Sequence, residues 1–167
     1  LFKAYNKTED DEIDLRNKIM QSLFKSVGKN VWIEPDFRCE FGKNITIGDN
    51  VYINFGCIIL DCADVTIGSN TLLGPNIGLY AANHSTDATE RINGGCYGKP
   101  IHIGNSVWLG GDVKVLAGVS IGDNSIIGAG SVVTKNIPSN VIAVGNPCKV
   151  IREITDKDKT EYSKRIR

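Results

Sequence analysis

The chain of 167 residues contains two histidines, His84 and His102. An imidazole titrates near pH ~6.5, so it can take a proton from an attacking hydroxyl and pass it on at neutral pH. His84 lies in an irregular segment and is the candidate general base. His102 lies between Ile101 and Ile103, a pattern that indicates a structural residue on a strand.

The five cysteines show no metal-binding pattern. None is spaced as CxxC or placed beside paired histidines, as a zinc site requires. They stand at positions 39, 57, 62, 96 and 148. Scattered cysteines in odd number favour free thiols, so we expect a cytoplasmic protein that requires no metal.

The charge balance argues against two classes of partner. Nineteen basic residues oppose nineteen acidic ones, so the formal net charge is zero. Nucleic acids and anionic membranes attract proteins with a concentrated positive field, so neither is expected as the main partner. No stretch approaches ~18 uninterrupted apolar residues, so no transmembrane helix is predicted.

A six-residue repeat decides the expected fold. Its aliphatic position recurs at Ile103, Leu109, Val115, Ile121, Ile127 and Val133, and upstream, in steps of six or eight, at Ile33, Cys39, Ile47, Ile53, Ile59, Ile67, Leu73 and Leu79. The fifth position of each repeat is small or branched. Together with 18 glycines and only 7% aromatic residues, this pattern is typical of hexapeptide solenoids.

We therefore expect an all-β fold, a left-handed parallel β-helix over residues 31–146. Three short strands make one triangular coil of about 18 residues, and the aliphatic position points inward to stack on its equivalents. Gly48-Asp49-Asn50 and Gly122-Asp123-Asn124 supply corner residues that tolerate unusual backbone angles. An ordinary β-sandwich would alternate without a fixed six-residue spacing.

Separate segments should cover the ends of the solenoid, because exposed sheet edges tend to pair with other chains. Residues 1–30 are the N-terminal cap, with one amphipathic helix that begins at Thr8 and stops at Gly28. Residues 147–167 are a C-terminal tail, expected as a short extension or helix with Ile151 and Ile154 as anchors.

The six-residue rhythm stops between Leu79 and Ile101, so residues 80–100 are a loop insertion. A structureless excursion of this length is uncommon inside a regular solenoid, and such loops are usually functional. His84 lies at its base, where the rigid coil gives way to the loop. This position favours a catalytic role for His84.

Several motifs together resemble the galactoside and maltose O-acetyltransferases, which are hexapeptide-repeat enzymes. The motifs are Asp61-Cys62-Ala63-Asp64-Val65-Thr66-Ile67-Gly68, Asn83-His84, Gly98-Lys99-Pro100-Ile101, Val107-Trp108-Leu109-Gly110-Gly111, Gly118-Val119-Ser120-Ile121-Gly122-Asp123-Asn124, Val132-Val133-Thr134-Lys135 and Gly145-Asn146-Pro147. The resemblance runs from about Phe24 to Arg152. Family members usually begin with a further helical segment that helps to hold the acceptor sugar, and we expect that segment to be missing or shortened here.

The resemblance implies transfer of an acetyl group from acetyl-CoA to a sugar hydroxyl. His84 would be the general base, taking the hydroxyl proton and delivering it to the departing CoA thiolate. Gly111 matches the position where relatives place a small residue near the thioester, and its backbone N–H would stabilise the oxyanion. A glycine at a coil corner also needs no function, so a structural role for Gly111 is the alternative.

The acceptor contacts implied by the resemblance are Tyr52, Asn54, Asp61, Glu40 and Cys96. Asn54 breaks the small-residue rule of its repeat, and such breaks are expected at functional sites. The carboxylates of Glu40 and Asp61 are alternatively solvated corner groups. Relatives often carry an acidic residue where this chain has Cys62.

The resemblance also places coenzyme A in a groove between neighbouring solenoids. Ala129, Thr134 and Lys135 would lie along its pantetheine arm, with Lys149 and Arg152 near its phosphates. Lys135, or Lys149 with Arg152, are alternatively solvated surface charges. Trp108 is expected to pack at a coil corner. Because family members are trimers, we expect a homotrimer with three sites, each built from two chains.

Two other classes share part of this pattern. A γ-type carbonic anhydrase has the same β-helix but binds zinc with three imidazoles, which two histidines cannot supply. A non-catalytic scaffold has no reason to keep a histidine-bearing loop. Within the enzyme class, a xenobiotic drug or a lipo-oligosaccharide is the alternative acceptor.

Overall fold

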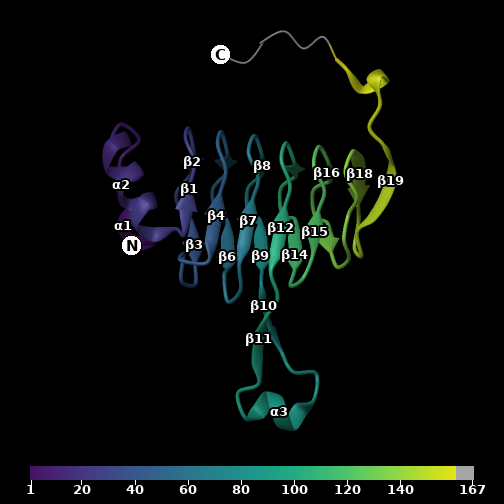
Figure 1. Cartoon of the computed structure of the whole chain (residues 1–167), viewed down its shortest axis with the longest axis horizontal. Coiled ribbons are helices and arrows are strands. Elements are labelled where there is room, and N and C mark those ends of the chain that lie inside the picture. Colours follow the sequence, from purple (N-terminus) through teal and green to yellow (C-terminus); the bar gives the residue numbers. More distant parts are fainter. Residues whose placement is uncertain (161–167) are drawn as a thin grey trace.

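The structure is a computed structural model that describes residues 1–160, so positions 161–167 of the predicted tail lie outside the described residues. Stacked coils follow one another along the long axis, with two helices at one end and a hairpin that projects from the middle (Figure 1). Three mainly parallel sheets run along the stack. The predicted parallel β-helix is confirmed.

Each sheet collects one short strand from successive coils, and we name the sheets A, B and C in the order in which the chain visits them. Sheet A contains β1 (Ser26–Val27), β4 (Ile45–Ile47), β7 (Val65–Ile67), β12 (Ile101–Ile103) and β15 (Ser120–Ile121). Sheet B contains β2 (Trp32–Ile33), β5 (Tyr52–Ile53), β8 (Leu72–Leu73), β13 (Trp108–Leu109), β16 (Ile126–Ile127), β18 (Val141–Val144) and the antiparallel β19 (Lys149–Glu153). Sheet C contains β3 (Arg38–Cys39), β6 (Ile58–Leu60), β9 (Gly78–Tyr80), β14 (Lys114–Leu116) and β17 (Val132–Val133).

The core is the column that the repeat predicts. The aliphatic position of each predicted repeat, from Ile33 to Val133, is buried, and so is the small or branched fifth position. Where the fifth residue is polar, its hydroxyl is satisfied: Thr71 donates to the Gly104 carbonyl at 2.9 Å and Ser125 to the Pro138 carbonyl at 2.8 Å. Buried hydroxyls need such partners, because these hydrogen bonds offset the cost of removing the hydroxyl from water.

Asparagines stack at the corner between sheets A and B, which we call corner AB. The two extra residues of the early coils lie instead between sheets C and A, in the steps from Cys39 to Ile47 and from Ile59 to Ile67. Asn30, Asn50 and Asn70 stand twenty residues apart and adopt φ values of 54°, 56° and 59°. Their side chains form a ladder, in which each amide donates to the next at 3.0 Å. Asparagine tolerates the left-handed region better than most residues, so it suits this corner.

The N-terminal cap differs from the single predicted helix. It contains α1 (Phe2–Tyr5) and α2 (Ile13–Leu23). Thr8 does not cap a helix, because its buried hydroxyl donates to the Tyr5 carbonyl at 2.7 Å. Gly28 does not end one either: it lies in the first coil, where a Cβ would come within 2.3 Å of Asp49 Oδ1. The predicted helix limits are therefore wrong at both ends.

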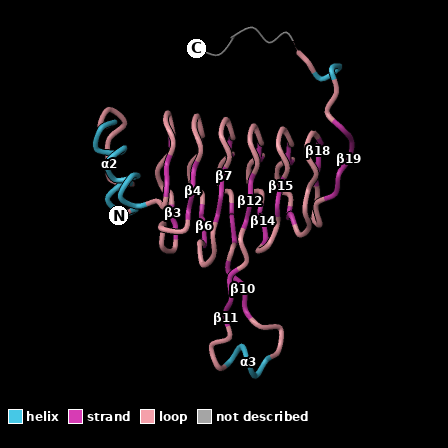
Figure 2. Tube along the Cα trace, viewed as in Figure 1, coloured by secondary structure: helices cyan, strands magenta, loops and turns pink. Residues whose placement is uncertain are grey.

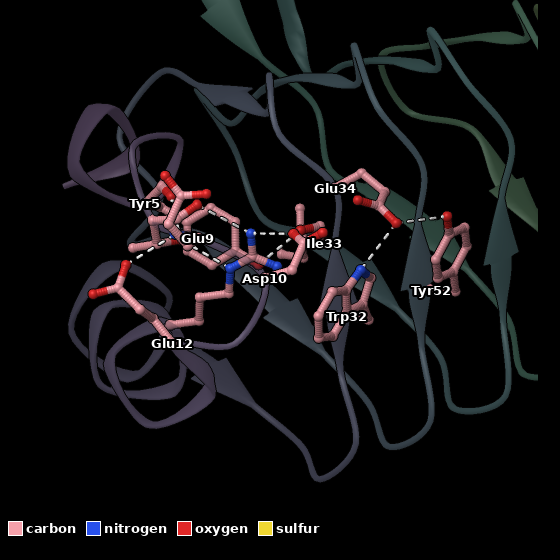
Figure 3. Close-up of polar contacts among 10 residues, drawn as sticks. Tyr5, Glu9, Asp10, Glu12, Trp32, Ile33, Glu34 and Tyr52 are labelled. Carbon is pink, nitrogen blue, oxygen red and sulfur yellow. Dashed lines mark hydrogen bonds and ion pairs between the residues drawn. The ribbon is translucent and has the colours of Figure 1, made fainter.

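Arg16 ties the cap to the first coil. Its guanidinium is buried, lies 4.9 Å above the Trp32 ring, and forms an ion pair with Asp10 at 2.9 Å. Beside it the Tyr5 hydroxyl donates to the Ile33 carbonyl at 2.7 Å (Figure 3). A buried charge needs such partners, so this network fixes where the cap sits.

The tail continues from β18 as the antiparallel strand β19, and a 3-10 helix (Asp156–Asp158) follows. Ile151 is 59% exposed, so its predicted role as an anchor is wrong. Ile154 is half-buried, and its N–H donates to the Asn140 carbonyl at 2.8 Å. Within residues 1–160, no helix has the length and apolar character needed to cross a bilayer.

Candidate active site

The loop insertion is an ordered hairpin, so the expectation of a structureless excursion is wrong. β10 (Ala82–His84) and β11 (Cys96–Gly98) pair antiparallel, and the short helix α3 (Ala88–Ile92) forms the tip (Figure 2). Asp87 caps this helix by accepting the Glu90 N–H at 2.9 Å. Local side-chain bonds of this kind order a segment that has no core of its own.

His84 is the last residue of β10. Its direct partner across the ladder is Cys96, and both side chains are exposed. The base of the hairpin is tied to the coil, because the Lys99 N–H donates to the Ala81 carbonyl at 3.0 Å. The imidazole is therefore carried on paired backbone close to the solenoid.

The hairpin leaves the solenoid at corner CA, where the chain passes from sheet C to sheet A. Four predicted site residues lie at the same corner on other coils: Glu40, Asp61, Thr134 and Lys135. Residues at one corner of successive coils stack along the solenoid axis. The structure thus brings these residues to the side of the molecule that carries His84.

Asp61 is fully buried at corner CA. Its carboxylate accepts the Phe41 N–H at 2.9 Å and the Asn44 N–H at 3.3 Å. The alternative of a solvated carboxylate is therefore wrong for Asp61, whereas Glu40 is exposed. A buried carboxylate bound by backbone donors orders the turn of the preceding coil.

A second group of predicted residues lies at corner BC, between sheets B and C: Asn54, Gly111 and Ala129. Asn54 Oδ1 accepts the Phe55 N–H at 2.8 Å. The Gly111 N–H makes no hydrogen bond to another residue in the described range 1–160. An unengaged backbone donor is what an oxyanion site requires.

Tyr52 lies on the outer side of sheet B, beside Trp32 in the ladder. Glu34 Oε1 accepts from both the Tyr52 hydroxyl and Trp32 Nε1, at 3.0 Å each (Figure 3). Partial burial, followed by the bond to Glu34, raises the pKa of Tyr52. Sequence reasoning missed Glu34, although the twenty-residue spacing of Trp32 and Tyr52 already indicates neighbours on adjacent coils.

The tail supplies cations on the outer side of sheet B. Arg152 donates to both carboxylate oxygens of Asp158, at 2.8 and 2.6 Å. This bond raises the pKa of Arg152 and, with the Thr155 N–H, holds the pKa of Asp158 well below its usual range. Lys135 and Lys149 form no ion pair with another residue of the described chain.

Apart from Tyr52, Lys149 and Arg152 on sheet B, the predicted site residues divide between two corners of one chain. His84, Cys96, Glu40, Asp61, Thr134 and Lys135 belong to corner CA, and Asn54, Gly111 and Ala129 belong to corner BC. Sheet C separates the two corners. Residues 1–160 contain no group of three or more side chains suited to hold a metal ion.

Trp108 lies on strand β13 and is 51% exposed, so the predicted packing at a corner is wrong. Its neighbour Leu72, one coil away in the same ladder, is 48% exposed. Phe55 at corner BC is 54% exposed. The outer side of sheet B and its edge thus present large apolar side chains to the surroundings.

Comparison with known proteins finds acetyltransferases built from hexapeptide repeats. A family model described as "Bacterial transferase hexapeptide (six repeats)" matches residues 100–135. The galactoside O-acetyltransferase of Escherichia coli is 48% identical over 164 residues, which cover 98% of this chain and 81% of that protein.

Two solved structures match nearly the whole of this chain. A galactoside acetyltransferase in complex with coenzyme A has a TM-score of 0.93 and 47% identity, covering 98% of this chain and 82% of that one. A maltose O-acetyltransferase from Clostridium difficile has a TM-score of 0.90 and 48% identity, covering 93% of this chain and 83% of that one. The chain belongs to the hexapeptide-repeat sugar O-acetyltransferases, the family of acetyl-CoA-dependent enzymes that includes the galactoside and maltose acetyltransferases.

Proposed function

We propose that this protein transfers an acetyl group from acetyl-CoA directly to a hydroxyl of a galactoside, maltose or glucose type sugar, with His84 as general base. The observation that carries the proposal is the position of His84 on the ordered hairpin, exposed beside corner CA. The relatives named as galactoside and maltose O-acetyltransferases support the sugar class.

The proposed reaction needs one proton relay and one oxyanion donor. The His84 imidazole removes the hydroxyl proton as the sugar oxygen attacks the thioester carbonyl. The Gly111 N–H, unengaged within residues 1–160, donates to the oxyanion of the tetrahedral intermediate. The intermediate then collapses to the acetyl ester, and the imidazolium returns the proton to the CoA thiolate.

Each site is proposed to lie between two chains of a homotrimer. His84 and Gly111 belong to different corners of one chain, which supports a site to which a neighbouring solenoid supplies one of them. The exposed apolar side chains of Phe55, Leu72 and Trp108 support a subunit contact on sheet B and its edge. Symmetric closure then gives equivalent sites.

Coenzyme A is proposed to lie in the groove between these solenoids. Ala129, Thr134 and Lys135 would contact its pantetheine arm. Lys149 and Arg152 would meet its phosphates, for which Arg152 has to exchange Asp158 for a phosphate. The five free cysteines support a reducing compartment, which we propose to be the cytoplasm.

An acceptor panel tests the function. Thiol release from acetyl-CoA is measured with galactosides, maltose, glucose, a xenobiotic drug set and a lipo-oligosaccharide as separate acceptors. The expected result is saturable release with at least one simple sugar. Release with the drug or the lipo-oligosaccharide alone would replace the sugar assignment by that alternative acceptor.

Subunit mixing tests the shared site. Trimers of His84→Ala and trimers of Asn54→Ala are each expected to be nearly inactive. When equal amounts of the two variants are unfolded, mixed and refolded, about one quarter of the sites should regain activity. Such a site takes an intact His84 from one chain and an intact Asn54, the acceptor contact that the resemblance implies, from its neighbour. If both residues act within one chain, mixing restores no activity.

A further inference from the structure

The strand β11, which carries Cys96, lies beside the turn that contains Cys62. A Cβ on Gly98 would lie 2.8 Å from the Cβ of Ala63 and 2.8 Å from the carbonyl oxygen of Cys62. Alternate residues of a strand point to the same side, so the Cys96 side chain points to the side that Gly98 turns toward the turn at Cys62 and Ala63. The turn that contains Cys62 therefore lies on the side of β11 to which Cys96 points, beside corner CA.

The imidazole of His84 lies on this side of the hairpin as well. His84 and Cys96 are direct partners in the ladder, and directly opposed residues share one face of a hairpin. Partial desolvation, followed by the charge of Cys96 and then those of Glu40 and Asp61, raises the pKa of Cys62. The strand geometry places Cys96 beside the turn of Cys62, and an effect of Cys96 on the pKa of Cys62 agrees with that placement.

Both thiols are accessible, whereas the others are not. Cys62 and Cys96 are exposed, and Cys39, Cys57 and Cys148 are buried. Burial raises the pKa of Cys39 to about 12 and that of Cys57 to about 11. Because the thiolate is the reactive form, a disulfide reagent should react with the exposed pair first.

We propose that Cys62 and Cys96 form a redox modification site, in which a low-molecular-weight disulfide such as glutathione disulfide converts the pair to an intramolecular disulfide that covers His84. The effect on catalysis rests on the proposed function. The bond itself does not depend on it.

The chemistry balances in two exchanges. The Cys96 thiolate attacks the small disulfide, which forms a mixed disulfide and releases one small thiolate. The Cys62 thiolate then attacks the Cys96 sulfur, which forms the Cys62–Cys96 bond and releases the second small thiolate. Two protein thiols are oxidised, one small disulfide is reduced to two thiols, and the two protons of the cysteines end on those thiols.

Closure requires the hairpin to lean toward the corner. A disulfide needs Cα atoms about 4.4–6.8 Å apart. Gly98 is the residue of β11 that lies against the turn of Cys62, and Cys96 lies about 7 Å farther along the strand, so Cys96 has to move toward that turn. All of β11 is exposed, and α3 has no buried residue, so little packing opposes this movement. The bond would hold the hairpin against the corner and block the approach of an acceptor to His84.

The test treats the full chain with glutathione disulfide and maps peptides by mass spectrometry without reduction. The expected product links the peptides of Cys62 and Cys96 within one chain, leaves Cys39, Cys57 and Cys148 as free thiols, and loses at least tenfold in acetyl transfer until dithiothreitol is added. Separate glutathione adducts on Cys62 and Cys96, or a link between two chains, would overturn the proposal.

Three variants separate the bond from its effect. Cys62→Ser and Cys96→Ser should each carry one glutathione and no internal link, while the matched control Cys148→Ser should form the link as the unchanged protein does. Each activity is compared with that of the same variant in its reduced form. A link without any acetyl transfer in reduced protein contradicts the proposed function, whereas active protein without a link contradicts the disulfide.

Discussion

The coils and the hairpin are built on opposite principles. In the coils, every inward position from Ile33 to Val133 is buried in one continuous column. In the hairpin, β11 is exposed along its whole length and α3 has no buried residue. Backbone pairing and polar contacts hold the hairpin, whereas apolar burial holds the coils.

This difference separates stability from chemistry. The residue proposed for proton transfer lies where few apolar contacts form, so it can be replaced at little cost to folding. The coils supply a rigid base that fixes where the hairpin begins. Changes in the two regions should therefore be read out by different measurements.

The largest effect is expected in the hairpin. His84→Ala should lower kcat by about 10²–10⁴, since a general base contributes about that factor, and leave the melting temperature unchanged. The matched control is His102→Ala, which changes the exposed imidazole of strand β12. Thiol release and thermal melts check both. Equal losses of activity in the two variants would remove the distinction between hairpin and coil.

The opposite result is expected in the column. Leu109→Ala deletes a fully buried side chain and should destabilise the protein by about 2–5 kcal/mol. Ile92→Ala, at a residue 83% exposed in α3, should change stability by less than about 0.5 kcal/mol. Denaturation at one protein concentration checks the pair, and a comparable loss for Ile92→Ala would show that the hairpin has a core after all.

Asp61 is a buried polar group of the coils, at the corner from which the hairpin leaves. Asp61→Asn leaves one of two backbone donors unpaired at a buried corner and should cost about 1–3 kcal/mol. Glu40→Gln, at an exposed carboxylate of the same corner, should leave stability nearly unchanged. Urea denaturation distinguishes them. If both variants melt alike, the buried carboxylate does not order the corner.

A smaller effect is expected at corner AB. Asn50 has φ of 56°, so Asn50→Ala should cost about 1–2 kcal/mol through backbone strain. Asn50→Gly loses the same side-chain bonds without that strain, and it should destabilise less. Thermal melts of both variants measure the difference, and an alanine variant as stable as the glycine one would contradict the strain.

The smallest effect concerns the tail. The pKa of Asp158 is lowered by the bond to Arg152, so the contribution of this pair is present above the ordinary carboxyl pKa and is lost as the pH falls through the lowered value. The protection factors of the β19 amides, which correct for the pH dependence of intrinsic exchange, should therefore fall as the pH drops below the ordinary carboxyl pKa. Asp158→Asn should remove that pH dependence, and the coils should show neither change.

Much of the fold is predictable because its signal is periodic. The aliphatic position recurs many times between Ile33 and Val133, and the residue at each of these positions is buried. The helix limits were not predictable, because Thr8 looks like a cap but bonds to Tyr5 in a compact turn. Gly28 likewise resembles the end of a helix in the sequence. In the structure a glycine is needed there because Asp49 approaches too closely for a side chain.

The sequence by itself determined the coil, the break in its rhythm at residues 80–100, and His84 at the base of that break, since these depend on spacing and residue type. Only the tertiary structure decided which residues share a corner. Asn54 and Asp61 are near in sequence yet lie at corners BC and CA, whereas the turn of Cys62 lies beside the strand of Cys96 although the two are distant in sequence. The reason is that stacking brings together residues a coil apart. Each strand is only two or three residues long, so the next corner soon carries the chain to another side of the solenoid.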